Sequence, residues 1–173
     1  LIPEISLTYQ TVMRFYRRFG SCISVMHSRL SAGERWDQYE RARQGETQVM
    51  IGARSALFTD FPDLGLIIMD EEHEGAYKSE STPRYHAREV AEKLAQMRNA
   101  AFVMGSATPS LEAYTRAEAG IYRLYTLKSR AGEGSALASA EVVDLRKEME
   151  EGNKSIFSRR LQELIRDRLE KKE

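Results

Sequence analysis

The sequence is poor in cysteine, and it has no surplus of either charge. Its one cysteine, Cys22, excludes an internal disulfide and a cysteine-rich zinc site built from this chain alone. Lysine and arginine number 26 and aspartate and glutamate also number 26, so no global positive field favours nucleic acid, and any such binding must be local. A reducing, cytoplasmic setting is predicted.

Long apolar runs are also lacking, and none could span a bilayer. With 173 residues, of which 42% are hydrophobic and 30% charged, the chain has the balance of a globular protein with one ordinary domain. It opens with Leu1 instead of Met and has no basic-then-apolar signal segment. A charged amphipathic helix is predicted over 159–173, without a stop signal after it. We therefore expect a piece truncated at both ends, with no membrane partner.

Apolar runs alternate with segments of helical periodicity along most of the chain. The runs predict buried strands at 22–26, 49–51, 64–69 and 101–104. The intervening periodicity predicts helices at 8–18, 32–43, 87–98 and 110–119, with a capping box of Ser31 and Glu34 before the second. This alternation predicts an α/β fold with a mainly parallel sheet flanked by helices.

The last third of the chain is less regular. Short strands are predicted at 122–127 and 141–145. A linker is predicted over 129–140, because most of that stretch is Gly, Ser and Ala. A helical apolar stripe that needs a partner surface follows, formed by Phe157, Leu161, Leu164, Ile165 and Leu169.

An acidic box follows directly after the third predicted strand. Its residues, Asp70-Glu71-Glu72-His73, would lie at the carboxyl end of a buried parallel strand, where α/β folds bind ligands. Asp70 would hold Mg²⁺ through oxygen, and Glu71 would orient and deprotonate the water that attacks a phosphate. His73 would sense the state of the γ-phosphate. The alternative interpretation is a set of solvated acids at a strand end.

A second polar loop, 105–110, follows the next predicted strand, so the two loops should emerge at one edge of adjacent strands. The hydroxyls of Ser106 and Thr108 could then reach His73 and couple the two loops. The alternative is an ordinary helix start, with Thr108 as the N-cap and Pro109 in the first helical position.

Taken in order along the chain, several stretches resemble the motifs of superfamily 2 helicases. They match the family of bacterial primosomal replication-restart helicases in particular, which carries an Asp-Glu-Glu-His box. The matching stretches are Pro3-Glu4-Ile5-Ser6-Leu7-Thr8, His27-Ser28, Gly33-Glu34-Arg35, Ile51-Gly52-Ala53-Arg54-Ser55-Ala56-Leu57-Phe58, Asp70-Glu71-Glu72-His73-Glu74 and Gly105-Ser106-Ala107-Thr108-Pro109-Ser110.

The resemblance implies a RecA-like P-loop NTPase lobe within an ATP-dependent 3′ to 5′ DNA helicase that restarts stalled replication forks and assembles the primosome. It implies Mg²⁺ and ATP as cofactors, and zinc only in the missing part of a second lobe. The implied partners are single-stranded and forked DNA, primosome proteins and single-strand-binding proteins. Residues 1–128 would be a partial first lobe, 129–140 a linker and 141–173 the first elements of the second lobe.

The resemblance also implies two sets of DNA contacts. Ser6, Thr8, Arg54 and Ser55 would bond backbone phosphates. Tyr77, Lys78, Arg84 and Tyr85 would form an aromatic-rich loop that stacks on bases, pairs with phosphates and couples single-strand binding to hydrolysis. The alternative for this loop is a packed surface segment that covers the sheet edge. Where the family commonly has proline before Gln10, this chain has Tyr9, so the local turn would be looser.

No Gly-x-x-x-x-Gly-Lys-Ser/Thr loop occurs in the sequence, so the usual cradle for the β- and γ-phosphates is missing. We therefore expect this chain alone to lack ATPase activity. Two other interpretations stay open at this point: a different superfamily 2 DNA translocase, and a DNA-binding module without catalysis.

Overall fold

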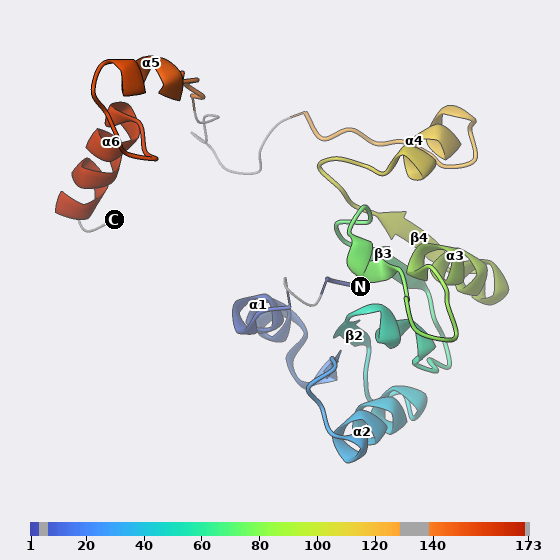
Figure 1. Ribbon diagram of the computed structural model, residues 1–173. Helices are drawn as coiled ribbons and strands as arrows, with labels where there is room; N and C mark the ends of the chain where they lie inside the picture. The colour runs from blue at the N-terminus through green and yellow to red at the C-terminus, as the bar shows by residue number, and fades with distance from the viewer. Residues whose placement is uncertain (4–6, 129–138, 172–173) are drawn as a thin grey trace. The chain divides into compact units, whose positions relative to one another are not determined.

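The computed structural model describes residues 1–3, 7–128 and 139–171. Ser6, one of the predicted phosphate contacts, and residues 129–138 of the predicted linker lie outside the described residues. The chain forms two units, Leu1–Leu124 and Tyr125–Glu173, which are considered separately below (Figure 1).

The first unit contains all of the predicted strands and helices that precede residue 120. The helices are α1 (Tyr9–Phe19), α2 (Ala32–Arg43), α3 (Ala87–Arg98) and α4 (Leu111–Glu118). The strands are β1 (Ile23–Met26), β2 (Val49–Gly52), β3 (Leu66–Met69) and β4 (Ala101–Met104). Short 3₁₀ turns η2 (Gly20–Cys22), η3 (Arg54–Phe58) and η4 (Gly75–Tyr77) lie between them. The eight predicted elements are thus confirmed, each end within two residues.

Side-chain caps explain where the helices begin. Ser31 and Glu34 form the predicted capping box, in which each side chain accepts the other residue's backbone N–H. At α4 the predicted N-cap Thr108 is wrong. The cap is Ser110, whose hydroxyl accepts the N–H of Ala113, and Pro109 therefore stands outside the helix.

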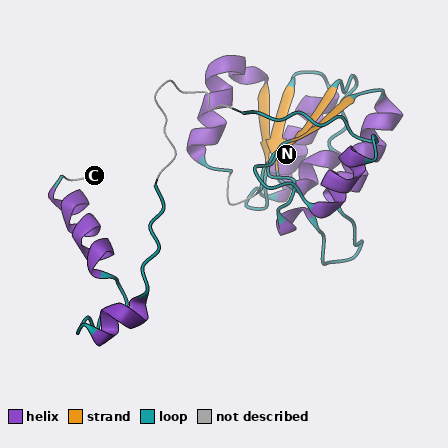
Figure 2. Cartoon of the chain, turned by 90° about the horizontal axis from the view of Figure 1, so that it is seen from above, coloured by secondary structure: helices purple, strands orange, loops and turns teal. Residues whose placement is uncertain are grey.

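The strands form two parallel pairs instead of one continuous sheet. β1 pairs with β2, with Ile23 opposite Val49, and β3 pairs with β4, with Leu66 opposite Ala101. Figure 2 shows the four strands gathered together within this unit. Leu1 and Ile2 bridge the two pairs: Ile2 donates to the carbonyl of Gly52 at 2.9 Å, and the carbonyl of Leu1 accepts the N–H of Asp70 at 3.0 Å. The predicted parallel α/β class is confirmed, with two residues serving as the link between the pairs.

The core lies on one face of the β3–β4 pair, where α3 packs. Ile67 and Met69 of β3 meet a row of small residues on α3, namely Ala87, Ala91 and Ala95, which lets the helix lie close to the strands. The opposite face carries Leu66, Ile68 and Val103, which are 50–52% exposed. The strands predicted as buried are therefore covered on one face only within the described residues.

The regular elements described after residue 124 are both helices. α5 (Leu145–Glu150) and α6 (Arg159–Glu170) belong to the second unit. The strands predicted at 122–127 and 141–145 are wrong. Tyr122 is held by hydrogen bonds of its hydroxyl with Arg116 and Glu92, and Asp144 accepts the N–H of Arg146 as the N-cap of α5. Of the helices in the described ranges, none is both long and apolar enough to cross a membrane.

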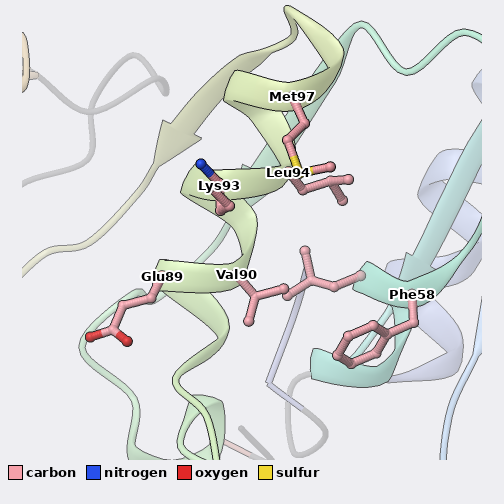
Figure 3. Close-up of a pocket in the computed structure, with 7 residues that line it drawn as sticks. Phe58, Glu89, Val90, Lys93, Leu94 and Met97 are labelled. Atoms are coloured by element: carbon pink, nitrogen blue, oxygen red, sulfur yellow. The ribbon is translucent and has the colours of Figure 1, made fainter.

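An open apolar depression lies between η3 and α3 (Figure 3). Leu57 and Phe58 line one side, and Val90, Leu94 and Met97 line the other. Glu89 and Lys93 also border it (Figure 3). Because its lining is almost wholly apolar, the groups able to do acid–base chemistry must be sought elsewhere, at the carboxyl ends of the strands.

Gly52 offers a test of how closely the chain packs at the end of β2. A Cβ atom added there would lie 2.3 Å from the carbonyl oxygen of Met26 and 2.9 Å from the Cβ of Ala56. We expect Gly52→Ala to lower the free energy of unfolding by about 2 kcal/mol or more, because backbone must shift to admit the methyl group. Urea unfolding would measure the loss. Gly33→Ala, at an open position in α2, is the matched control and should stabilise slightly.

Candidate functional site

The acidic box forms a sharp turn at the end of β3. Glu71 has a φ of 47°, in the left-handed region that residues with side chains rarely adopt. The Asp70 carboxylate bonds the backbone of this turn, since its Oδ1 accepts the N–H of Glu71 at 3.1 Å. Such strain persists only where surrounding contacts impose it, and it gathers at functional sites. The turn leaves the carboxylate of Asp70 exposed to solvent and that of Glu71 partly exposed.

The loop after β4 docks onto this turn through the backbone. Gly105 donates its N–H to the carbonyl of Met69 at 2.8 Å, and its own carbonyl accepts the N–H of Glu72 at 3.0 Å. The two loops therefore continue the pairing of β3 and β4 beyond the strands. A Cβ atom on Gly105 would lie 3.6 Å from Asp70 Oδ1, which is an ordinary van der Waals distance. The two loops therefore lie close together and still leave room for a side chain at this position.

His73 and Ser106 join the two loops through their side chains. His73 Nδ1 lies 2.6 Å from Ser106 Oγ, and Glu71 Oε2 lies 3.6 Å from the same nitrogen. Ser106 Oγ also accepts the backbone N–H of Thr108 at 3.1 Å. The structure thus brings Glu71, His73 and Ser106 together as expected. Thr108 takes part through its N–H, while its side chain is exposed, and its predicted coupling role stays a prediction.

A buried ion pair lies behind the turn, and the sequence-based prediction missed it. Glu72 is 2% exposed and Arg88, at the start of α3, is 7% exposed; their side chains meet at 3.2 Å. Both also contact the hydroxyl of Ser110, and Glu72 accepts the N–H of Ser110 as well. The available signal was the helical spacing that places Arg88 on the same face as Ala91 and Ala95, where a charge needs a buried partner.

Tyr77, predicted to stack on bases, is instead a buried residue. Its side chain is 1% exposed within the core cluster under β3, and its hydroxyl donates to the carbonyl of Asp70 at 2.7 Å. Burial, together with the neighbouring Asp70 carboxylate, raises the pKa of the Tyr77 phenol well above its usual range. The residue therefore supports the acidic turn from below and stays protonated.

Arg54, whose predicted phosphate contact stays a prediction, also bonds the backbone of the protein. Its Nη1 donates to the carbonyls of Ala76 and Lys78, at 3.0 and 2.8 Å. This nitrogen thus ties η3 to the loop after the acidic turn.

The other predicted DNA contacts that fall in the described residues remain at the surface. The side chains of Thr8, Ser55, Lys78 and Arg84 are exposed. Thr8 also caps α1 by accepting the N–H of Thr11. Tyr85 is half-buried, and its ring lies edge-on to that of Phe58 with centroids 5.5 Å apart. The aromatic-rich loop is thus divided between one core tyrosine, Tyr77, and one tyrosine near the surface.

The donor set of the turn fits a magnesium ion that is held mainly by phosphates and water. Within the described ranges, no three His, Cys, Asp or Glu side chains are gathered in a way that could hold a metal by themselves. The carboxylates of Asp70 and Glu71 are hard oxygen ligands at the same turn, and Mg²⁺ commonly uses one or two such groups beside substrate phosphates. The residues present therefore suit Mg²⁺ brought with a nucleotide.

Comparison with known proteins agrees with this arrangement. A family model described as DEAD/DEAH box helicase matches residues 1–117. Replication restart protein PriA of Bacillus subtilis is 49% identical over 173 residues, which are 100% of this chain and 21% of that protein. The proteins of the same name from Synechocystis and Haemophilus influenzae are 45% and 49% identical, over 94% and 84% of this chain and 20% of each relative. The chain spans about a fifth of the length of these relatives.

The buried pair predicts a large penalty when one partner is removed. Arg88→Met should leave the charge of Glu72 without a counterion and lower the free energy of unfolding by roughly 3–5 kcal/mol. Arg98→Met is the matched control, because the Arg98–Asp60 pair is 41% and 47% exposed and should contribute less than about 1 kcal/mol. Denaturant unfolding measures both, and equal losses would contradict the assignment.

His86 should make the free energy of unfolding depend on pH. It caps α3 by accepting the N–H of Arg88 on Nδ1, and burial, with the nearby Arg88 charge, lowers its pKa. Since the folded state favours the neutral ring, its contribution is full above the unfolded pKa of about 6.5 and is lost as the pH falls through the lower folded pKa.

His86→Asn should keep the cap and flatten the pH profile of stability. Unfolding curves between about pH 7.5 and pH 5 would show it, with His27→Asn as the matched histidine control. A profile that is unchanged in His86→Asn would refute this account.

Proposed function

Because the chain belongs to the DEAD/DEAH box helicase family, we propose that residues 1–128 form part of the first motor lobe of an ATP-dependent DNA helicase that restarts stalled replication forks. The chain has the RecA-like α/β fold of that family. The observation that carries the proposal is the strained acidic turn of Asp70 and Glu71, joined through His73 to Ser106 on the neighbouring loop. The relatives are named replication restart proteins, which supports the biological role.

The proposed chemistry is hydrolysis of ATP. Mg²⁺ bound with the nucleotide would neutralise charge on the phosphate oxygens. Asp70 would hold that ion. Glu71 would orient a water molecule and accept its proton, because its carboxylate is partly exposed on a backbone with a positive φ. His73 lies between Glu71 and Ser106, so a change beside the phosphate could pass to the loop after β4.

The proposed DNA surface is formed by polar and basic groups near η3 and the aromatic-rich loop. Ser55, Lys78 and Arg84 are exposed, and Tyr85 is half-buried next to Phe58, where part of its ring would stack on a base. Such contacts hold single-stranded and forked DNA through phosphates and ring faces without reading sequence. We propose 3′ to 5′ unwinding in the cytoplasm, with primosome and single-strand-binding proteins as partners.

The second unit would supply the first elements of the second motor lobe, after the linker at 129–140. The apolar stripe on α6, which includes Leu161, Leu164 and Leu169, is 42–70% exposed within its own unit and so is open to packing by further chain. Zinc would belong to that lobe. We propose that the 173 residues alone do not hydrolyse ATP, because no phosphate-binding loop occurs among them.

Glu71→Gln in the complete protein that carries this chain tests the proposed chemistry. Loss of a general base should lower DNA-dependent ATP hydrolysis at least about 100-fold, with nucleotide and DNA binding retained. Glu74→Gln makes the same charge change three residues later and serves as the control. Unsubstituted protein that binds DNA but shows no hydrolysis would favour a non-catalytic module, and DNA-stimulated turnover by the isolated 173 residues would contradict their proposed inactivity.

A further inference from the structure

We propose that the outer face of α1 binds the phosphate backbone of duplex DNA and so holds the duplex arm of a fork. This face carries three exposed arginines, Arg14, Arg17 and Arg18, which are called the arginine stripe below. The inference rests on the proposed function, since it names a second form of DNA for the same lobe. The stripe lies outside the DNA surface proposed above at η3 and the aromatic-rich loop.

The arginine stripe is a local excess of positive charge in a chain that is neutral as a whole. In the described ranges, α1 is the only helix without an acidic residue. The three guanidiniums form no ion pair with any carboxylate of the described residues, whereas Arg43, Arg98 and Arg160 on other helices each do. The charge of the stripe is therefore available to a ligand.

Helical spacing places the stripe on the solvent side of α1. Arg17 and Arg18 follow Arg14 by three and four positions, so the three side chains are neighbours on the helix surface. Val12 and Phe15, on the other side, pack against the apolar cluster at the β1–β2 pair. Because that packing fixes how the helix is turned, the stripe is held outward as one surface.

The stripe opposes the stability of the helix, and the fold does not compensate for it. Arg14 and Arg18 are like charges at i and i+4, which destabilise a helix. The helix dipole favours Arg17 and Arg18 in the last turn, but Arg14 lies more than a turn from the end. A residue that breaks a local rule without compensation in the fold indicates a functional site. A ligand with a high density of negative charge would supply the compensation.

Duplex DNA fits the stripe better than a single strand does. Proteins hold single strands by stacking bases on aromatic rings beside basic groups. The exposed rings of α1, Tyr9 and Tyr16, lie roughly 140–180° around the helix from Arg14 and Arg18. A strand that contacts those arginines could not stack on these rings. A duplex needs no ring, and its phosphates supply about one negative charge per 1.7 Å of axis.

An acidic protein segment is the competing ligand, and the stripe lacks what a protein partner would need. Protein interfaces have an apolar or aromatic centre inside a polar rim. The residue that lies between Arg14 and Arg17 around the helix is Gln10, which is polar and exposed. A contact made of charge with no apolar centre is typical of binding to a nucleic-acid backbone.

One guanidinium of the stripe is already ordered. The central carbon of the Arg18 guanidinium lies 5.9 Å from the centroid of the Phe19 ring. This contact positions the group and uses none of its N–H donors in hydrogen bonds, so they can still form two parallel bonds to a phosphate. Less side-chain freedom is therefore lost when Arg18 binds.

The experiment measures how the complete protein binds a labelled blunt duplex, a poly-dT oligonucleotide and poly-glutamate at several salt concentrations. The test variant combines Arg14→Gln, Arg17→Gln and Arg18→Gln, since glutamine keeps a similar helix propensity. For the duplex, the slope of log affinity against log salt should become less steep by about 2.7, or about 0.9 for each lost phosphate contact. The Kd for the duplex should rise at least about tenfold in low salt, and that for poly-dT should stay within about twofold.

Two further variants separate the site from its charge. Combining Arg43→Gln, Arg98→Gln and Arg166→Gln removes the same charge from helices that also carry acidic residues, and it should leave the duplex slope unchanged. Replacing all three arginines of the stripe with lysine should also keep the slope, because the slope counts charges. Arg14→Gln alone, with an expected change of about 0.9, repeats the test with the least perturbation of the fold.

Three results would overturn the role of the stripe: an unchanged duplex slope in the test variant, equal weakening of duplex and poly-dT, or equal effects of the stripe and control variants. Unchanged duplex binding with weaker binding of poly-glutamate would assign the stripe to an acidic protein segment instead. Unsubstituted protein that binds poly-dT but no duplex would overturn this inference alone. Protein that binds neither DNA would overturn the proposed function as well.

Discussion

The carboxylate of Glu72 is almost completely removed from water, and a buried charge of this kind is tolerated only with a counterion and full hydrogen bonding. Arg88 supplies the charge, and Ser110 supplies its N–H and its hydroxyl. These partners come from the starts of α3 and α4, so one ionised group fixes the positions of both helices relative to the acidic turn. The meeting of His73 with Ser106 depends on that arrangement, because Ser106 lies on the loop that leads into α4.

Most of the local structure could be predicted because its signals are local. The capping box of Ser31 and Glu34, and the alternation of apolar runs with helical periodicity, depend on residues a few positions apart. The strand predicted at 122–127 failed because an apolar run does not reveal whether a neighbouring strand exists to pair with it. Leu66 and Ile68 likewise read as buried, while their exposure is decided by which elements cover each face of the strand.

Site residues whose positions are set by the ends of strands could be predicted from the sequence. Residues whose positions depend on packing against distant parts of the chain could not. Asp70, Glu71 and Ser106 follow adjacent parallel strands, so their proximity follows from topology. Tyr77 carries the same local signal as an exposed stacking residue, since a tyrosine beside a lysine suits either place, and its burial depends on contacts with residues far along the chain. The bonds of Arg54 Nη1 could not be predicted for a comparable reason, since the two carbonyls lie more than twenty residues away in the sequence.

The bridge made by Leu1 and Ile2 bears on how the boundaries of smaller pieces should be chosen. A pair of strands is only marginally stable by itself in water. Leu1 and Ile2 connect one pair to the other through their backbone bonds with Asp70 and Gly52. A deletion series begun at Pro3 would therefore disconnect the two pairs before it reached any group with a chemical role. Loss of DNA binding in such a series would report the breaking of the sheet, and would wrongly map DNA contact to a segment whose contribution is mechanical continuity.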